Sequence, residues 1–177
     1  MISKWIKEHN ENAHIVFIGP CVAKKREAQK DEVHKYVDYV LTFEELQALV
    51  DARDIEATAL EESPLDNASY YGRIFARSGG LSDAVKEALK EQNSDFEVKP
   101  LACDGIDNCK LGLLKAKSPT RDFNFVEGMA CPGGCIGGPC MLTHEIRNKM
   151  DVDKYGRSAK ETSIKESISI YCDDLTK

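Results

Sequence analysis

One segment restricts the fold of this 177-residue chain more than any other: EGMACPGGCIGGPC, at residues 127–140. It carries Cys131, Cys135 and Cys140 within ten positions, separated mainly by glycine and proline. Glycine and proline interrupt both helices and strands, so the segment has to form a loop that carries three thiols. Glycine also lets a backbone wrap closely around a metal cluster, for which thiolates are ligands.

The number of cysteines points to metal binding or catalysis rather than to disulfides. There are seven cysteines, an odd number, and residues 1–10 lack the apolar core of a signal peptide. No apolar run approaches the roughly 20 residues of a membrane span. Charges of both signs are interspersed within a net charge of −6, which disfavours nucleic-acid binding. We expect a cytoplasmic protein with no membrane span and no nucleic-acid partner.

Apolar runs alternate with helical periodicities, which predicts an α/β fold with a mainly parallel sheet flanked by helices. The expected strands are 14–19, 37–42, 96–103 and 122–131, and the expected helices are 2–9, 43–53, 81–89 and 105–117. The continuous apolar run 14–19 is typical of a buried parallel strand. Thr42 and Glu45 form a capping-box pattern, and Leu111 and Leu114 are expected to face inward.

The predicted topology also suggests where a site would lie. Cys21 and Cys131 each follow a predicted strand, and sites of parallel sheets gather beyond the carboxyl ends of the strands. We therefore expect these two thiols at one edge of the sheet. Residues 54–71 are expected to form an irregular loop. The chain is expected to form a single domain over 1–177, with 141–177 as a peripheral tail.

The cysteine spacing favours an iron–sulfur cluster over zinc, because a zinc ribbon typically shows two Cys-x2-Cys pairs and this chain has none. Lys24 and Lys25 follow Cys21, and their ammonium groups would suit an anionic cluster, although a solvated helix face is the simpler interpretation. Thiol chemistry and structural cysteine remain open from the residues alone. Cys103 and Cys109 are interpreted as either reactive thiols or buried structural side chains.

Three segments in this order resemble landmarks of the FeFe-hydrogenase (iron-only hydrogenase) large subunit: GPCVAKKREA at 19–28, FARSGG at 75–80 and EGMACPGGC at 127–135. The resemblance covers essentially the whole chain, as the C-terminal part of the H-cluster domain. It implies a 4Fe–4S cluster joined through a cysteine sulfur to a two-iron unit with CO, cyanide and a dithiolate. It also implies reversible proton reduction to H2, a ferredoxin-type electron carrier or adjacent cluster domain as partner, and maturation proteins.

The resemblance further implies roles for individual residues. Its 4Fe–4S ligands include Cys21, Cys131 and Cys135, of which Cys135 also bridges to the two-iron unit. The pocket around the two-iron unit would include Lys24, as a hydrogen-bond donor to cyanide, together with Met129 and Phe75. Glu127, just before the Met-Ala-Cys sequence, is a candidate acceptor behind the ligands.

The chain departs from the catalytic members at three places. An upstream Thr-Ser-Cys segment, with the fourth ligand and the proton-relay cysteine, is missing, which suggests a fragment of a longer protein. Gly19 stands where those members usually have methionine, and IGGPCML replaces glycines followed by Gln-Pro. These last changes resemble sensory or low-activity branches. The alternatives are therefore H2 or redox sensing, or an electron-transfer module whose ordinary 4Fe–4S cluster also uses Cys140. The isolated chain is expected to hold its cluster weakly or not at all, and to be inactive.

Overall fold

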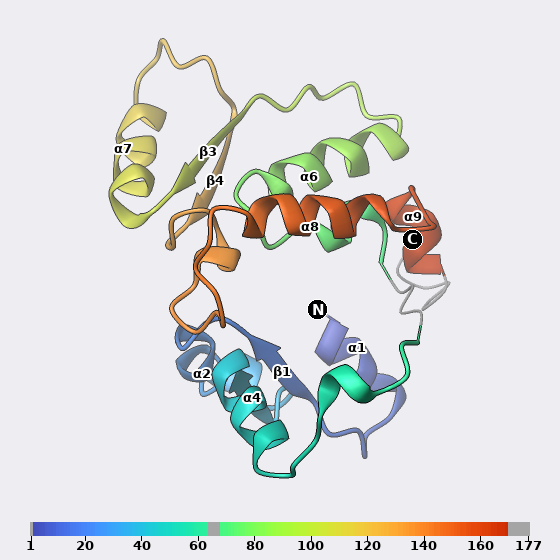
Figure 1. Cartoon of the computed structure of the whole chain (residues 1–177). Helices are drawn as coiled ribbons and strands as arrows, with labels where there is room; N and C mark the ends of the chain where they lie inside the picture. The colour runs from blue at the N-terminus through green and yellow to red at the C-terminus, as the bar shows by residue number, and fades with distance from the viewer. Residues whose placement is uncertain (1, 64–67, 170–177) are drawn as a thin grey trace. The chain divides into compact units, whose positions relative to one another are not determined.

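Two separate parallel sheets, each of two strands, organise the chain (Figure 1). The structure is a computed structural model that describes residues 2–63 and 68–169, so Cys172 lies outside the described residues. The chain divides into two compact units. Unit 1 comprises Met1–Glu62 with Gly138–Thr143, and unit 2 comprises Ser63–Gly137 with His144–Lys177.

Unit 1 is built around β1 (Val16–Gly19) and β2 (Tyr39–Thr42), which pair in parallel with Val16 opposite Tyr39. Its helices are α1 (Ile2–His9), α2 (Ala23–Glu27), α3 (Asp31–His34) and α4 (Phe43–Asp51), followed by a 3-10 turn, η1 (Ala57–Ala59). The predicted strands at 14–19 and 37–42 are confirmed in shortened form. The predicted capping box is also confirmed: Glu45 N donates to Thr42 Oγ1 (3.2 Å), and Thr42 N donates to the Glu45 carboxylate (2.9 Å).

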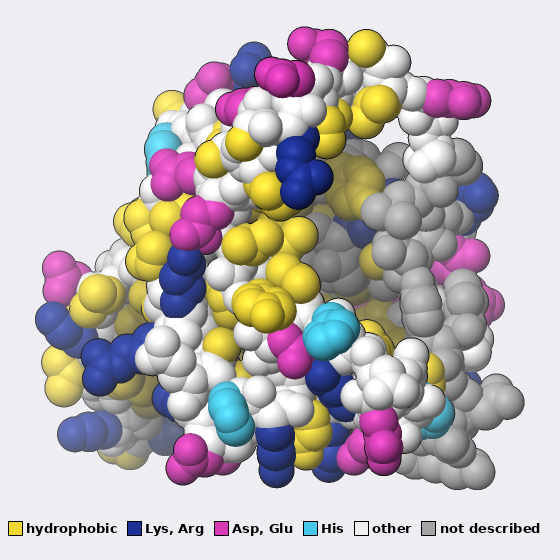
Figure 2. Space-filling view, turned by 90° about the horizontal axis from the view of Figure 1, so that it is seen from below, with side chains coloured by type: hydrophobic (Ala, Val, Ile, Leu, Met, Phe, Trp, Pro, Cys, Tyr) yellow, Lys and Arg dark blue, Asp and Glu magenta, His cyan; other side chains and the backbone are white. Residues whose placement is uncertain are grey.

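The prediction that 14–19 is a buried strand is wrong. Val16, Phe17 and Ile18 are 39–44% exposed, and Gly19 is the one buried residue of β1. In a two-stranded sheet both strands are edges, and the short helices of unit 1 cover only part of it. Figure 2 shows hydrophobic side chains lying together on the surface among charges of both signs. An apolar run thus indicated a strand here, but not its burial.

Unit 2 pairs β3 (Pro100–Asp104) with β4 (Phe125–Met129), again in parallel, with Pro100 opposite Phe125 and Asp104 opposite Met129. The predicted strands 96–103 and 122–131 are therefore correct in place and too long. The helices of unit 2 are α5 (Tyr70–Arg73), α6 (Gly80–Glu91), α7 (Ile106–Ala116), α8 (Asn148–Arg157) and α9 (Ile164–Ser169), with a 3-10 turn, η2 (Cys135–Gly137). The predicted α/β class with parallel strands and flanking helices is confirmed. Among the described residues, no helix combines the length and the apolar character needed to cross a membrane.

Helix α7 packs on β3 and β4 through small side chains, and the prediction that Leu111 and Leu114 face inward is wrong. These leucines are 54% and 61% exposed. The Cys109 sulfur lies 3.5 Å from the carbonyl oxygens of both Cys103 and Met129. A Cβ at Gly112 would lie 2.4 Å from the Cys103 sulfur. The helix approaches the sheet too closely for leucine, so its small-residue face is buried and its apolar stripe is not. Cys103 and Cys109 thus both lie in the helix–sheet contact.

Replacing Gly112 with alanine is expected to lower the free energy of unfolding by about 1–3 kcal/mol, because the new methyl group overpacks against the Cys103 sulfur. Removing that sulfur in the double variant Gly112→Ala, Cys103→Ala leaves the next Cys103 atom at 3.8 Å, an ordinary contact. Urea unfolding of the unmodified protein, the two single variants and the double variant forms a double-mutant cycle. The double variant should be more stable than the sum of the two single losses predicts, by more than about 0.5 kcal/mol. Additive losses would mean that the helix shifts away instead.

Candidate functional site

The cysteine loop, residues 130–137, begins where β4 ends. Gly105 N donates to the carbonyl oxygen of Met129 (2.9 Å), and Gly133 N donates to the Asp104 carboxylate (3.0 Å). Within the loop, Gly134 N donates to Cys131 O, and Gly137 N donates to Gly134 O, both at 3.0 Å. The loop is therefore tied to the carboxyl end of the β3–β4 sheet, as expected for a site in a parallel sheet. Cys131 is half-buried and Cys135 is exposed.

The FARSGG segment pairs with this loop in the antiparallel direction. Ser78 N donates to Gly133 O (2.9 Å), Ile136 N donates to Ala76 O (3.3 Å), and Arg77 faces Gly134 in an antiparallel bridge. Two of the three landmark segments identified in the sequence are thus in direct backbone contact. Neither segment predicted this pairing by its own pattern, because the two lie far apart in the chain.

Two glycines of the loop are required by its geometry. Gly134 has φ of +92°, and a Cβ there would lie 2.6 Å from Ser78 N and 2.8 Å from Ala76 O. A Cβ at Gly137 would lie 2.0 Å from Pro132 O. Real side chains do not tolerate such approaches, so the loop closes on itself and on the FARSGG segment in a form open only to glycine. This is the tight backbone that the glycine spacing predicted around Cys131 and Cys135.

Glu127, on β4, is 1% exposed and accepts three hydrogen bonds from the start of α6. The donors are Gly79 N (2.8 Å), Ser82 N (2.9 Å) and Ser82 Oγ (2.5 Å). The sequence pointed to Glu127 as an acceptor behind the ligands, but it could not show that the donors belong to a helix 45 or more residues earlier. The carboxylate therefore joins β4 to the end of the FARSGG segment.

Arg77 is a buried charge that the sequence analysis did not single out. It is 8% exposed and donates to Asp153 Oδ1 (2.6 Å) on α8 and to Asp83 Oδ2 (3.0 Å) on α6. Burial alone would lower the pKa of Arg77, but its hydrogen bonds to these carboxylates raise that pKa above the usual value. The only sequence signal for this role was the presence of a charged residue inside the FARSGG segment. Its side chain ties the segment that pairs with the cysteine loop to two helices.

Unit 1 brings two other cysteines together. Cys21 follows β1 and Pro20, and Cys140 N donates a long hydrogen bond (3.4 Å) to Pro20 O. Cys21 is half-buried, whereas Cys140 is 7% exposed. Burial raises the pKa of the Cys140 thiol, and the carboxylates of Glu44 and Glu45 add to that rise. Cys140 thus belongs structurally with Cys21, although in sequence it belongs to the 127–140 segment.

Lys24 and Lys25 each have an acidic partner in unit 1. The Lys24 ammonium lies 2.6 Å from the Glu27 carboxylate, and Lys25 pairs with Glu45. The hydrogen bond from Lys24 lowers the pKa of Glu27. Both lysines are half-buried and positively charged on the α2 turn that follows Cys21.

The predicted site residues are distributed over both units. Unit 1 holds Cys21, Lys24 and Cys140; unit 2 holds Phe75, Met129, Cys131 and Cys135. Cys21 and Cys131 do follow strands, but the expectation of one shared sheet edge is wrong, because β1 and β4 belong to different sheets. Phe75 is 46% exposed and Met129 is half-buried. Within residues 2–63 and 68–169, no three Cys, His, Asp or Glu side chains are arranged as a site for a metal ion.

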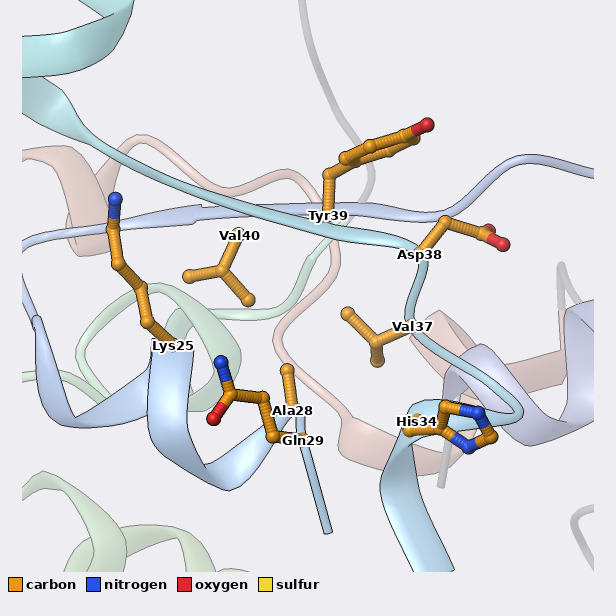
Figure 3. A pocket seen from close by; sticks show the side chains of 8 residues that line it. All are labelled: Lys25, Ala28, Gln29, His34, Val37, Asp38, Tyr39 and Val40. Atoms are coloured by element: carbon orange, nitrogen blue, oxygen red, sulfur yellow. The ribbon is translucent and has the colours of Figure 1, made fainter. Parts of the chain in front are cut away.

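A cavity of about 560 Å³ in unit 1 contains none of the predicted site residues (Figure 3). Its walls come from α2, α3 and the residues around the start of β2, where Ala28, Val37 and Val40 contribute apolar surface. The Lys25 side chain at its rim is paired with Glu45, and Asp38 accepts hydrogen bonds from Lys7 and Ile15 N. These two charged side chains of the cavity thus already have partners, and the cysteine sites remain the candidate functional site.

Comparisons with known proteins show the family and the fold of this chain. Residues 1–139 match the family described as "Iron only hydrogenase large subunit, C-terminal domain". Iron hydrogenase 1 of Clostridium pasteurianum is 26% identical over 180 residues, covering 81% of this chain and 31% of that protein. The probable cytosolic Fe–S cluster assembly factor narfl of Dictyostelium discoideum is 26% identical over 214 residues, covering 94% of this chain and 38% of that protein.

The fold is similar to that of solved hydrogenases. The apo FeFe-hydrogenase HydA1 from Chlamydomonas reinhardtii superposes with a TM-score of 0.59 at 17% identity, over 98% of this chain and 63% of that one. This chain spans about a third of the length of the curated relatives named above. The family match covers most of the chain, including Cys21, the FARSGG segment and the cysteine loop. The chain therefore belongs to the family formed by the C-terminal domain of the iron-only hydrogenase large subunit.

Proposed function

We propose that this chain binds an iron–sulfur cluster through Cys21, Cys131 and Cys135, as part of an iron-only hydrogenase-like protein. The cysteine loop carries the proposal. Its backbone closes in a form open only to glycine, and it presents one half-buried and one exposed cysteine. Thiolates on such a loop fit the ligand chemistry of a 4Fe–4S cluster. This chain spans about a third of the curated relatives, and the fourth ligand is expected from the rest of the whole protein.

The finer proposal is a complete H-cluster, for which Cys135 would be a ligand shared by the 4Fe–4S cluster and the two-iron unit. When bound, that group supplies reversible reduction of protons to H2, with electrons exchanged with a ferredoxin-type carrier or an adjacent cluster domain. Phe75 and Met129 would line the pocket and exclude water. Maturation proteins would load the group. A cytoplasmic location is proposed because one relative is named as a probable cytosolic cluster assembly factor.

The proposed role of Lys24 has a small energetic cost. Its ammonium group has three N–H donors, of which the ion pair with Glu27 uses one, so donation to a cyanide ligand would at most require breaking that pair. The two side chains are 42% and 46% exposed, and ion pairs at such positions contribute at most about 1 kcal/mol. The ion pair therefore does not prevent Lys24 from acting as a donor.

One observation favours a second candidate, an electron-transfer module with an ordinary 4Fe–4S cluster. Cys140 lies against Pro20, the residue before Cys21, so these two thiols share a neighbourhood within unit 1. Cys140 would then be the fourth ligand in place of a cysteine from the rest of the whole protein. Its raised pKa opposes ligation near neutral pH, since a metal-bound thiol has to lose its proton.

The substitution Cys140→Ser separates the two candidates. If the first holds, the full-length protein should keep its iron and sulfide content, and infrared bands of CO and cyanide should appear after maturation. Cys103→Ser is the matched control, because Cys103 is also buried with a raised pKa and is proposed as no ligand. Loss of iron in Cys140→Ser alone, with no CO or cyanide bands in the unmodified protein, would instead favour the electron-transfer module.

A further inference from the structure

We infer that Glu127 is a positioning residue for Cys131 and Cys135: its buried carboxylate fastens the start of α6 to β4 and so holds the cysteine loop in place. The inference rests on the proposed function, because it assigns a role in presenting the cluster ligands. Glu127 itself lies four positions before Cys131 and is proposed to touch no ligand. It acts through the backbone of the FARSGG segment.

The contacts form a closed ring. β4 leads from Glu127 through Met129 into the cysteine loop. The loop pairs with residues 76–78 through the bonds of Gly133 O and Ile136 N. Residues 76–78 continue directly into Gly79 and Ser82, which donate back to Glu127. β4 and residues 76–82 are thus joined at two places, by the cysteine loop and by the Glu127 carboxylate.

The carboxylate is needed because α6 has no cap of its own. The N-cap residue is Gly79, with φ of +84° and no side chain to accept a hydrogen bond. The first N–H groups of a helix otherwise lack partners, and a negative charge there also suits the helix dipole. Glu127 supplies both the acceptors and the charge from a neighbouring strand. Glutamine would keep the shape but present an NH2 group to at least one of three donors.

A second carboxylate in unit 2 also accepts hydrogen bonds from the first N–H groups of a helix, but this helix does not pair with the cysteine loop. Glu91 accepts hydrogen bonds from Ile164 N (2.7 Å) and Lys165 N (2.9 Å), at the start of α9. α9 makes its main contacts with α6. Glu91→Gln is therefore a matched control, since it removes the same chemistry from a helix start that does not pair with the cysteine loop.

The test compares Glu127→Gln, Ser82→Ala and Glu91→Gln in the full chain, reduced and free of metal. Alkylation by iodoacetamide is followed by mass spectrometry at Cys131 and Cys135, with the buried Cys103 as internal reference. Glu127→Gln should accelerate alkylation at Cys131 about tenfold relative to Cys103, the factor for an unsatisfied buried donor of about 1.4 kcal/mol. Ser82→Ala, which keeps the charge, should give a smaller acceleration, and Glu91→Gln none.

Equal rates at Cys131 in Glu127→Gln and the unmodified chain would overturn the inference, and so would a proportional rise at Cys103, which indicates general loosening. A cluster arm distinguishes this from failure of the proposed function. In the full-length protein, release of iron to a chelator should be faster in Glu127→Gln than in Glu91→Gln; equal release rates would overturn the inference and leave cluster binding intact. If the unmodified protein takes up no iron and sulfide, the proposed function fails, and alkylation alone decides the role of Glu127.

Discussion

Replacing Cys135 with alanine is expected to reduce iron and sulfide in the full-length protein to background. The cysteine loop carries Cys135 at the surface, and Cys135 is one of the proposed cluster ligands. Cluster affinity depends on the number of thiolates, and losing one of the proposed ligands leaves a labile site. The free energy of unfolding of the metal-free protein should change by less than about 0.5 kcal/mol, as is usual for an exposed side chain. The measurements are iron and sulfide analysis and urea unfolding.

Cys103→Ala should behave in the opposite way. Its sulfur fills the contact between α7 and the sheet, so its removal leaves a small cavity and lowers stability by about 1 kcal/mol. Cluster content should stay at the level of the unmodified protein. If Cys135→Ala retained the full cluster, Cys135 would not be a ligand, and the cysteine loop would have to be reinterpreted as a structural turn.

The second large effect is expected at Gly134. Gly134→Ala should lower the free energy of unfolding by about 3 kcal/mol or disrupt the loop, because backbone strain and steric overlap act together. The strain follows from φ of +92°, and the overlap from a Cβ within 3 Å of backbone atoms of Ser78 and Ala76. Backbone atoms cannot rotate away as a flexible side chain can. The free energy of unfolding measured in urea and the iron and sulfide content of the full-length protein should both fall.

Gly133→Ala is the matched control for this prediction. Gly133 has a similar φ of +80°, but a Cβ there would meet no atom within 4 Å. Gly133→Ala should therefore lower the free energy of unfolding only by the strain of the left-handed conformation, about 1–2 kcal/mol. If the two alanine variants lost equal stability, the pairing between the cysteine loop and residues 76–78 would not be as tight as its hydrogen bonds indicate.

Local patterns in the sequence predicted local structure well. The capping box at Thr42 and Glu45 forms as expected, because both partners lie within one turn. The parallel pairing was also predicted, since short apolar strands were separated by helical segments. Patterns that depend on a neighbour were less reliable. Leu111 and Leu114 form an apolar stripe, yet α7 buries Cys109 and Gly112 because close contact with β3 leaves no room for larger side chains.

The sequence by itself determined the family, the α/β class and the cysteine loop. The class follows from local hydrophobic periodicity, and the loop follows from the glycines and cysteines themselves. Only the tertiary structure decided which segments hold that loop. It paired residues 76–78 with the loop and supplied α6 with a cap from Glu127. It also placed Cys140 beside Pro20 rather than within the cysteine loop. Such contacts join residues that are distant in the chain, so no local periodicity or motif spacing specifies them.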